Sequence, residues 1–135
     1  MQQYDRVTLR QARHHNASRY VDLDEALFDL ARVHHERIGS NRRASHREVR
    51  KLVALLRSTY KKTARAAGLT VNHYDAKIYA LRAVFMHYCK LLGLVVSYAE
   101  DEFDSPVFVI DGCEVVDAMT LDYPLANAGL IPDFR

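Results

Sequence analysis

The hydrophobic pattern changes its period at Gly93, and this change divides the chain into a helical part and an extended part. Before Gly93, apolar side chains recur at steps of three and four residues, which places them on one face of an α-helix. After Gly93, short runs of β-branched and aromatic residues are separated by turn residues, as is typical of strands. The sequence therefore predicts an α+β fold, in which a three-helix N-terminal bundle is followed by a small antiparallel sheet of about three strands.

The first helix is predicted in the stretch 22–38. Asp22 or Asp24 is its candidate N-cap, and Gly39 follows its last periodic residue. The side chains expected to face the core from this helix are Leu23, Leu27, Ala31, His34 and Ile38.

The second helix is the longest and has two distinct faces. It is predicted to begin at Ser45 and Glu48, which have the Ser-x-x-Glu spacing of a capping box, and to end at Gly68. Its apolar stripe consists of Val49, Leu52, Val53, Leu56, Tyr60, Ala64 and Ala67. Its opposite face is cationic and consists of Arg47, Arg50, Lys51, Arg57, Lys61, Lys62 and Arg65. A helix of this kind packs one side on the core and leaves the other open to solvent or to an anionic partner.

The third helix, 73–92, is apolar on nearly all sides apart from its first turn. Such a helix is predicted to be central and buried between other elements. Thr70 or Asn72 is its candidate N-cap. One of its apolar faces consists of Tyr74, Ile78, Leu81, Phe85, Tyr88 and Leu92.

The strands are expected over 94–99, 106–110 and 113–116, with an acidic loop between the first two. Asp111-Gly112 separates the last two strands and predicts a hairpin, because a type I′ turn needs two positive φ angles. The tail is expected to form a short helical turn and an ordered coil. Its packing residues are predicted to be Leu125, Leu130 and Ile131.

The length of 135 residues fits one domain, and we predict a flexible basic arm over 1–20 followed by a single α+β domain over 21–135. No apolar run is long enough to cross a bilayer, and the first residues lack the apolar core of a signal peptide. We therefore expect a cytoplasmic protein with no membrane partner. Cys89 and Cys113 have neither disulfide nor metal spacing, so both are predicted to be small buried apolar residues.

The sequence contains no motif for catalysis or cofactor binding. It lacks a phosphate loop, a dinucleotide fingerprint, a nucleophile elbow and a zinc-ligand pattern. Neighbouring histidines such as His34 and His35 diverge by about 100° on a helix and cannot easily share one ion. We therefore predict a non-enzymatic binding protein with no catalytic residues, no cofactor and no metal site.

Charge is distributed very unevenly along the chain. Residues 1–68 contain 15 lysines and arginines against 7 acidic residues, a net charge of +8, whereas residues 69–135 contain 4 against 10, a net charge of −6. This asymmetry favours nucleic acid or another polyanion as the partner of the basic half. Two alternatives are that the halves neutralise each other within the fold, or that basic and acidic faces pair between two copies.

The junction of the second and third helices, KKTARAAGLTVNHYDAK, has an Ala-x-x-x-Gly-Leu pattern at Ala64, Gly68 and Leu69. With the strands that follow, residues 45–117 resemble winged helix-turn-helix DNA-binding domains. The resemblance implies that Thr70 caps the helix that reads bases. It places Lys61, Lys62 and Arg65 on phosphates, and Asn72, His73, Asp75 and Lys77 at the base-reading end.

Two functions are predicted from these features. The first is that of a nucleic-acid-binding regulator that uses the basic helix 46–67 and the turn after it. Its candidate contacts are Arg47, Arg50, Lys51, Arg57, Lys61, Lys62, Arg65, Asn72, His73 and Lys77. The second is that of a protein-binding inhibitor, adaptor or immunity-type module, alone or as a homodimer, that docks through its separate basic and acidic surfaces. Its candidate partner-binding residues are Glu100, Asp101, Glu102 and Asp104.

Overall fold

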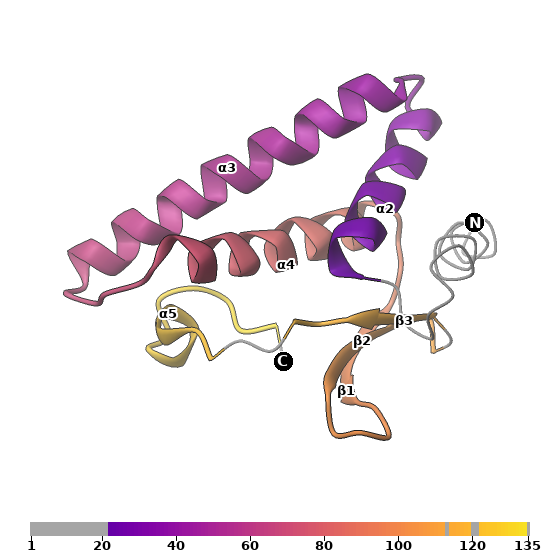
Figure 1. Ribbon diagram of the computed structural model, residues 1–135. Helices are drawn as coiled ribbons and strands as arrows, with labels where there is room; N and C mark the ends of the chain where they lie inside the picture. Colours follow the sequence, from indigo (N-terminus) through magenta and orange to yellow (C-terminus); the bar gives the residue numbers. More distant parts are fainter. Residues whose placement is uncertain (1–21, 113, 120–121, 135) are drawn as a thin grey trace.

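The computed structural model describes residues 22–112, 114–119 and 122–134 (Figure 1). Three helices come first, followed by a three-stranded sheet and a short helix. The elements are α2 (Leu23–Arg37), α3 (Arg42–Ala66), α4 (His73–Leu91), β1 (Val96–Glu100), β2 (Pro106–Ile110), β3 (Glu114–Asp117) and α5 (Pro124–Asn127). The predicted α+β class, with the sheet after the third helix, is confirmed. The predicted basic arm and Cys113 lie outside the described residues.

Helix α4 is the centre of the molecule, as its all-round apolarity predicts. It packs against α2 and α3 on one side, and the sheet and the C-terminal segment lie on its other side (Figure 1). Phe85 of α4 stacks on Phe108 of β2 with ring centroids 5.4 Å apart. Tyr79 of α4 stacks on Tyr123 at 4.4 Å. The core therefore has two layers that share α4. One layer lies between α4 and the helices α2 and α3, and the other lies between α4 and the sheet with the C-terminal segment.

Helix α3 begins before the predicted capping box. Its N-cap is Asn41, whose side-chain oxygen accepts a hydrogen bond from the amide of Ala44 at 2.9 Å. Ser45 lies inside the first turns and is fully buried, and its hydroxyl has no partner among the described residues. The box at Ser45 and Glu48 was therefore a wrong prediction, because an asparagine one turn earlier caps the helix and extends it.

Helix α4 is capped by Asn72, whose Oδ1 accepts from the amide of Asp75 at 2.8 Å, so the alternative cap Thr70 is wrong. Three residues of the predicted apolar helix faces are instead exposed, namely Ala67, which is the C-cap of α3, Ile38 at 63% and Tyr74 at 65%. Ile38 is the C-cap of α2 and Tyr74 lies in the first turn of α4. All three positions are at helix ends, where fewer neighbouring elements cover the side chain.

The sheet is antiparallel with the order β1-β2-β3. Asp111 and Gly112 both have positive φ, at 52° and 77°, so the predicted hairpin between β2 and β3 is confirmed. The short helix after Pro124 is also confirmed. Leu125 is buried there, but Leu130 is largely exposed, contrary to the prediction.

A buried arginine joins α4 to the segment after β3. Arg82 is only 4% exposed, although it is a charged residue on the core side of a helix. Its Nε donates to the carbonyl of Ala118 and its Nη2 to the carbonyl of Met119, both at 2.7 Å. The guanidinium therefore donates to two backbone acceptors in a segment that belongs to neither a strand nor a helix.

Within the described part of the chain, no helix is both long enough and apolar enough to cross a bilayer. Cys89 is buried in α4, as predicted for a small apolar residue.

Candidate functional site

Helix α3 lies along one edge of the molecule (Figure 1). Its sequence concentrates positive charge there. Its 25 residues include Glu48 as the single acidic residue, and at 1.5 Å per residue they extend over about 37 Å. Its basic residues are Arg42, Arg43, Arg47, Arg50, Lys51, Arg57, Lys61, Lys62 and Arg65. Seven of these are exposed, all except Arg57 and Lys61. We call the four exposed residues on the face turned away from the core the outer cations: Arg47, Lys51, Lys62 and Arg65.

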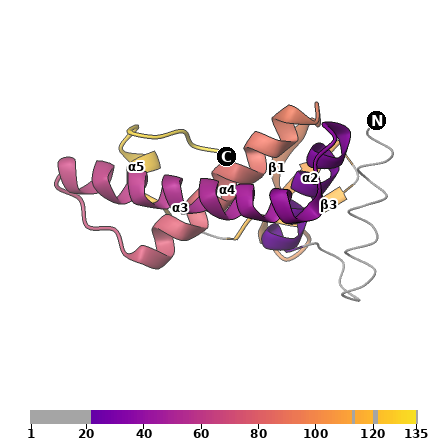
Figure 2. The same ribbon diagram turned by 90° about the horizontal axis from the view of Figure 1, so that it is seen from above.

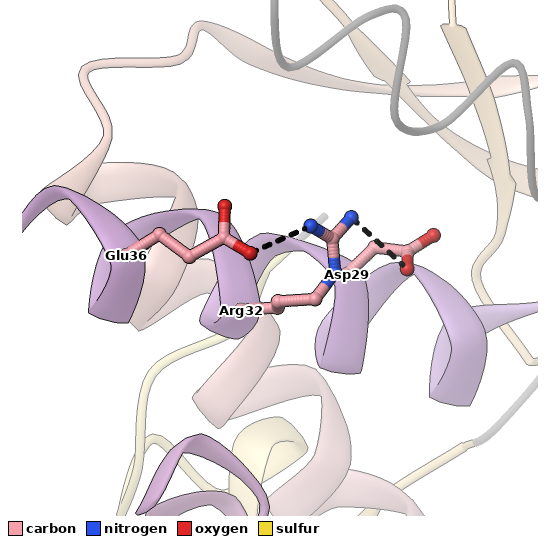
Figure 3. A network of polar contacts seen from close by, with 3 residues as sticks. All are labelled: Asp29, Arg32 and Glu36. Atoms are coloured by element: carbon pink, nitrogen blue, oxygen red, sulfur yellow. Dashed lines mark hydrogen bonds and ion pairs between the residues drawn. The ribbon is translucent and has the colours of Figure 1, made fainter. Parts of the chain in front are cut away.

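None of the α3 cations forms an ion pair with another of the residues that the structure describes. On α2, Asp29 and Glu36 pair with Arg32 of their own helix instead. Nη1 of Arg32 lies 3.1 Å from Oε1 of Glu36, and Nη2 of Arg32 lies 3.9 Å from Oδ1 of Asp29 (Figure 3). Burial raises the pKa of Asp29, and the charge of Arg32, followed by that of Arg42 on α3, opposes that rise without an ion pair between the described residues of α2 and α3. The positive charge of α3 is therefore not neutralised by direct contact with this neighbouring helix.

The N-terminal half of α3 forms a shallow hollow with a volume of about 510 Å³. It is lined by Arg42, Arg43, His46, Arg47 and Arg50. Such a convergence of guanidinium groups is suited to oxyanions, because each guanidinium presents several N–H donors in a fixed plane. Arg42 and Arg43 are additions to the predicted set, because the prediction started the helix too late to include them.

Cations from α3 and α4 meet at the corner where the two helices join. The positive charge of Arg57 is the main cause that lowers the pKa of His73, followed by desolvation and by the charges of Lys61 and Lys77. His73 is exposed, and three of the four causes of its lowered pKa are the positive charges that surround it at the corner. The structure therefore brings Arg57, predicted on the cationic face, together with Lys61, His73 and Lys77 of the predicted corner.

The other predicted corner residues lie elsewhere or are used differently. Lys62 and Arg65 are on the outer face of α3. The side-chain oxygen of Asn72 accepts the hydrogen bond that caps α4, so it is engaged in the helix cap and not open to a base edge.

The packing of the helices departs from that of a winged helix-turn-helix domain. Helix α4, which the resemblance makes the reading helix, passes across α3 and is covered by α2, α3 and the sheet (Figures 1 and 2). At its start only the first turn and Lys77 are exposed. Helix α4 therefore cannot lie along a DNA groove, whereas the outer face of α3 is open over its whole length.

A pocket with a volume of about 270 Å³ opens between α2, α3 and α4. Its apolar lining consists of Phe28, Val49, Val53, Ala54 and Leu81, and its charged lining of Asp24, Arg50, Arg57 and Lys77. The ring of Phe28 also lies against that of His46, with centroids 4.8 Å apart. The sequence prediction identified the cations of this pocket but not the pocket itself.

The acidic loop bounds a third concave region, with a volume of about 700 Å³, between α4 and the sheet. Its lining includes Asp75, Asp101 and Asp117 together with the exposed rings of Tyr74 and Phe103. We call this region the acidic groove. Of the four acidic residues predicted to bind a partner, only Asp101 lines it. The others are exposed, Glu100 at the end of β1 and Glu102 and Asp104 on the loop.

Asp101 also orders the loop that contains it. Its Oδ1 accepts hydrogen bonds from the amide of Phe103 at 2.8 Å and from the amide of Ser105 at 2.9 Å. This carboxylate thereby fixes the position of the Phe103 backbone at the edge of the acidic groove.

Tyr88, near the C-terminal end of α4, has histidine rings close to it from two helices. His34 and His35 come from α2, and His87 comes from α4. Nε2 of His35 lies 3.4 Å from the hydroxyl of Tyr88, and burial lowers the pKa of His34. Burial also raises the pKa of Tyr88 to about 12. Among the described residues, no group of three or more histidine, cysteine or acidic side chains has the arrangement of a metal site.

Comparison of the chain with protein-family models, with curated proteins and with solved structures gives no match.

Proposed function

We propose that this protein is a non-enzymatic nucleic-acid-binding protein that contacts the phosphate backbone through the outer face of α3. The observation that carries the proposal is the row of cations on α3, which lack ion-pair partners among the described residues. Such a surface gives a polyanion a large gain in binding free energy, because each phosphate contact releases condensed counterions. We propose a regulatory role as well. A protein that binds nucleic acid without catalysing a reaction acts by occupying its binding site.

The length and spacing of the outer cations fit a nucleic-acid backbone. A helix of about 37 Å is comparable to one turn of duplex DNA, which extends over about 34–36 Å. Arg47 and Lys51 form one pair of cations, and Lys62 and Arg65 form another about 20 Å further along the helix. The two pairs can contact separate phosphates, whereas the buried α4 offers no long surface for reading bases. We therefore expect binding with little preference for sequence.

The direct test is fluorescence anisotropy of labelled oligonucleotides titrated with the full chain. We expect binding at about 25 mM salt and a steep loss of affinity towards about 200 mM, because phosphate contacts are screened and their counterions are no longer released favourably. Absence of binding at the lower salt concentration, to duplex and single strand alike, would contradict the proposal.

His73 gives a local and pH-dependent readout of binding at the corner. In the free protein the neighbouring cations, Arg57 first, lower the pKa of His73. Phosphates near the corner would offset that repulsion, so we expect the pKa of His73 to rise when nucleic acid binds. By linkage, binding then becomes tighter as the pH falls through the range between the two pKa values.

NMR titration of the His73 ring protons, with and without an oligonucleotide, measures both pKa values. The exposed ring of His87, at the far end of α4, serves as an internal control and should change little. An unchanged pKa of His73 at saturating oligonucleotide would show that the corner is not part of the interface.

The acidic groove supports a second candidate function, the docking of a basic protein partner. Its three carboxylates and the exposed rings of Tyr74 and Phe103, the latter 73% exposed, combine negative charge with apolar anchors. A second copy of the chain supplies a matching surface in its own α3. Head-to-tail association in low salt would then compete with nucleic-acid binding.

Light scattering after size exclusion, in low and in moderate salt, tests this self-association. We expect a larger species only in low salt, and we expect Phe103→Ser to return it to the monomer because the exposed ring is lost from the interface. Leu130→Ser, which removes another exposed apolar side chain far from the groove in sequence, is the control. A monomer under all conditions would exclude the second copy as the partner.

A further inference from the structure

The pocket between α2, α3 and α4 differs from the outer face of α3 because it adds an apolar cavity to the cations. Arg50 and Arg57 line it from α3, and Lys77 lines it from α4. Behind these charges lie the buried side chains of Val49 and Leu81. A phosphate group alone makes no favourable contact with this apolar lining. The pocket therefore suits a ligand that combines negative charge with an apolar ring.

The chemistry of the lining matches the parts of a nucleotide. The three cations are suited to phosphates, and the half-buried ring of Phe28 provides an aromatic surface for a base. Asp24 is the one acidic residue of the lining. A carboxylate would repel phosphates, but it accepts hydrogen bonds from the amino groups of adenine, cytosine or guanine.

The size of the pocket limits what can enter it. Its volume of about 270 Å³ is just below the usual range for small-molecule sites, about 300–1,000 Å³. This space accommodates one base, while the rest of the ligand has to lie outside on the surface of α3. Arg50 lines both this pocket and the hollow at the N-terminal half of α3, so the two surfaces are continuous.

We propose that the pocket receives one unstacked base of a single-stranded nucleic acid, while the flanking phosphates lie on Arg50, Arg57 and Lys77. This inference rests on the proposed function and makes it more specific, because it names single strands as the preferred ligand. A base in a duplex has to be unpaired and unstacked before it can enter a pocket. A single strand presents its bases without that cost.

The substitution Ala54→Trp tests the contribution of the pocket to binding without changing the charge of α3. Ala54 is exposed at the edge of the pocket and has no charge, so an indole there fills the opening and leaves every cation in place. Leu55→Trp is the matched control, because Leu55 is the next residue of the same helix, is 59% exposed and does not line the pocket.

The experiment compares a mixed-sequence single strand with a duplex of the same length, by anisotropy at low salt. We expect wild type to prefer the single strand and Ala54→Trp to lose roughly tenfold in affinity for it, the effect of losing one stacked base. Duplex affinity should change by less than about twofold, since the phosphate contacts remain. Leu55→Trp should resemble wild type on both ligands.

A second measurement places 2-aminopurine, whose fluorescence depends on stacking, at one position of the single strand. Its emission should change on binding to wild type and to Leu55→Trp but not to Ala54→Trp. Equal affinities of wild type for the two ligands, with no effect of Ala54→Trp on either, would overturn the inference and leave the proposed function standing. Failure of every protein to bind either ligand would instead overturn the proposed function.

Discussion

Reversing the four outer cations together, in R47E/K51E/K62E/R65E, is expected to lower affinity for nucleic acid by about 100-fold or more at low salt. All four side chains are exposed and none has an ion-pair partner within the described chain, so their replacement removes no core contact. The loss comes from the electrostatics of the interface, because favourable phosphate contacts are replaced by repulsion. Anisotropy titrations of the same oligonucleotide with wild type and the variant measure it.

Single substitutions provide a control that is matched in charge. Lys51→Glu and Lys90→Glu change the net charge equally, and both residues are exposed on helices. Lys90 lies in the last turn of α4, away from the corner with α3. We expect Lys51→Glu to weaken binding clearly more than Lys90→Glu. Equal effects would mean that only net charge matters and that α3 is not the interface. Circular dichroism of each variant checks that the helices are intact.

Removing the buried guanidinium in Arg82→Ala is expected to destabilise the fold by about 3–5 kcal/mol. The two carbonyls that it serves, on Ala118 and Met119, would lose their 2.7 Å charged donors, and the side chain would leave a cavity in the core. This is a large part of the total stability of a domain of this size, which is about 5–15 kcal/mol. Urea denaturation followed by circular dichroism measures the free energy of unfolding.

Two further variants show whether the loss comes from the hydrogen bonds. Arg82→Lys keeps the charge but lacks the planar fork that reaches both carbonyls, so we expect an intermediate loss of stability. Lys90→Ala, on the exposed side of the same helix, should change the free energy of unfolding by less than about 0.5 kcal/mol. A loss below about 1 kcal/mol for Arg82→Ala would show that the guanidinium does not hold the segment after β3.

Elements whose signals are local in sequence could be predicted closely. The Asp111-Gly112 hairpin depends on two backbone conformations that these residues adopt easily, and β2 has the predicted bounds. The position of α4 follows from apolar residues around its whole circumference. The start of α3 was missed because two local signals competed. Asn41 and the pair Ser45 and Glu48 are both plausible caps, and packing of the first turn against the core favoured the earlier one.

The candidate site was only partly visible in the sequence, for the same physical reason. The cationic face of α3 follows from helical periodicity alone, so its residues could be identified in advance. The pocket depends on how three helices cross, and no spacing within one helix reveals that Phe28, Ala54 and Lys77 share it. Arg82 did give a signal, as a lone cation within an apolar helix, but its carbonyl partners lie 36 and 37 residues away.

The most direct test of the central claim is the dependence of affinity on salt for wild type and for a variant in which Lys51 and Lys62 are alanine. The logarithm of the binding constant should fall linearly with the logarithm of salt concentration, and the slope should become shallower by about 0.7 to 0.9 for each lost phosphate contact. We therefore expect the variant to have a clearly shallower slope than wild type. Identical slopes would show that the outer face of α3 does not contact phosphates.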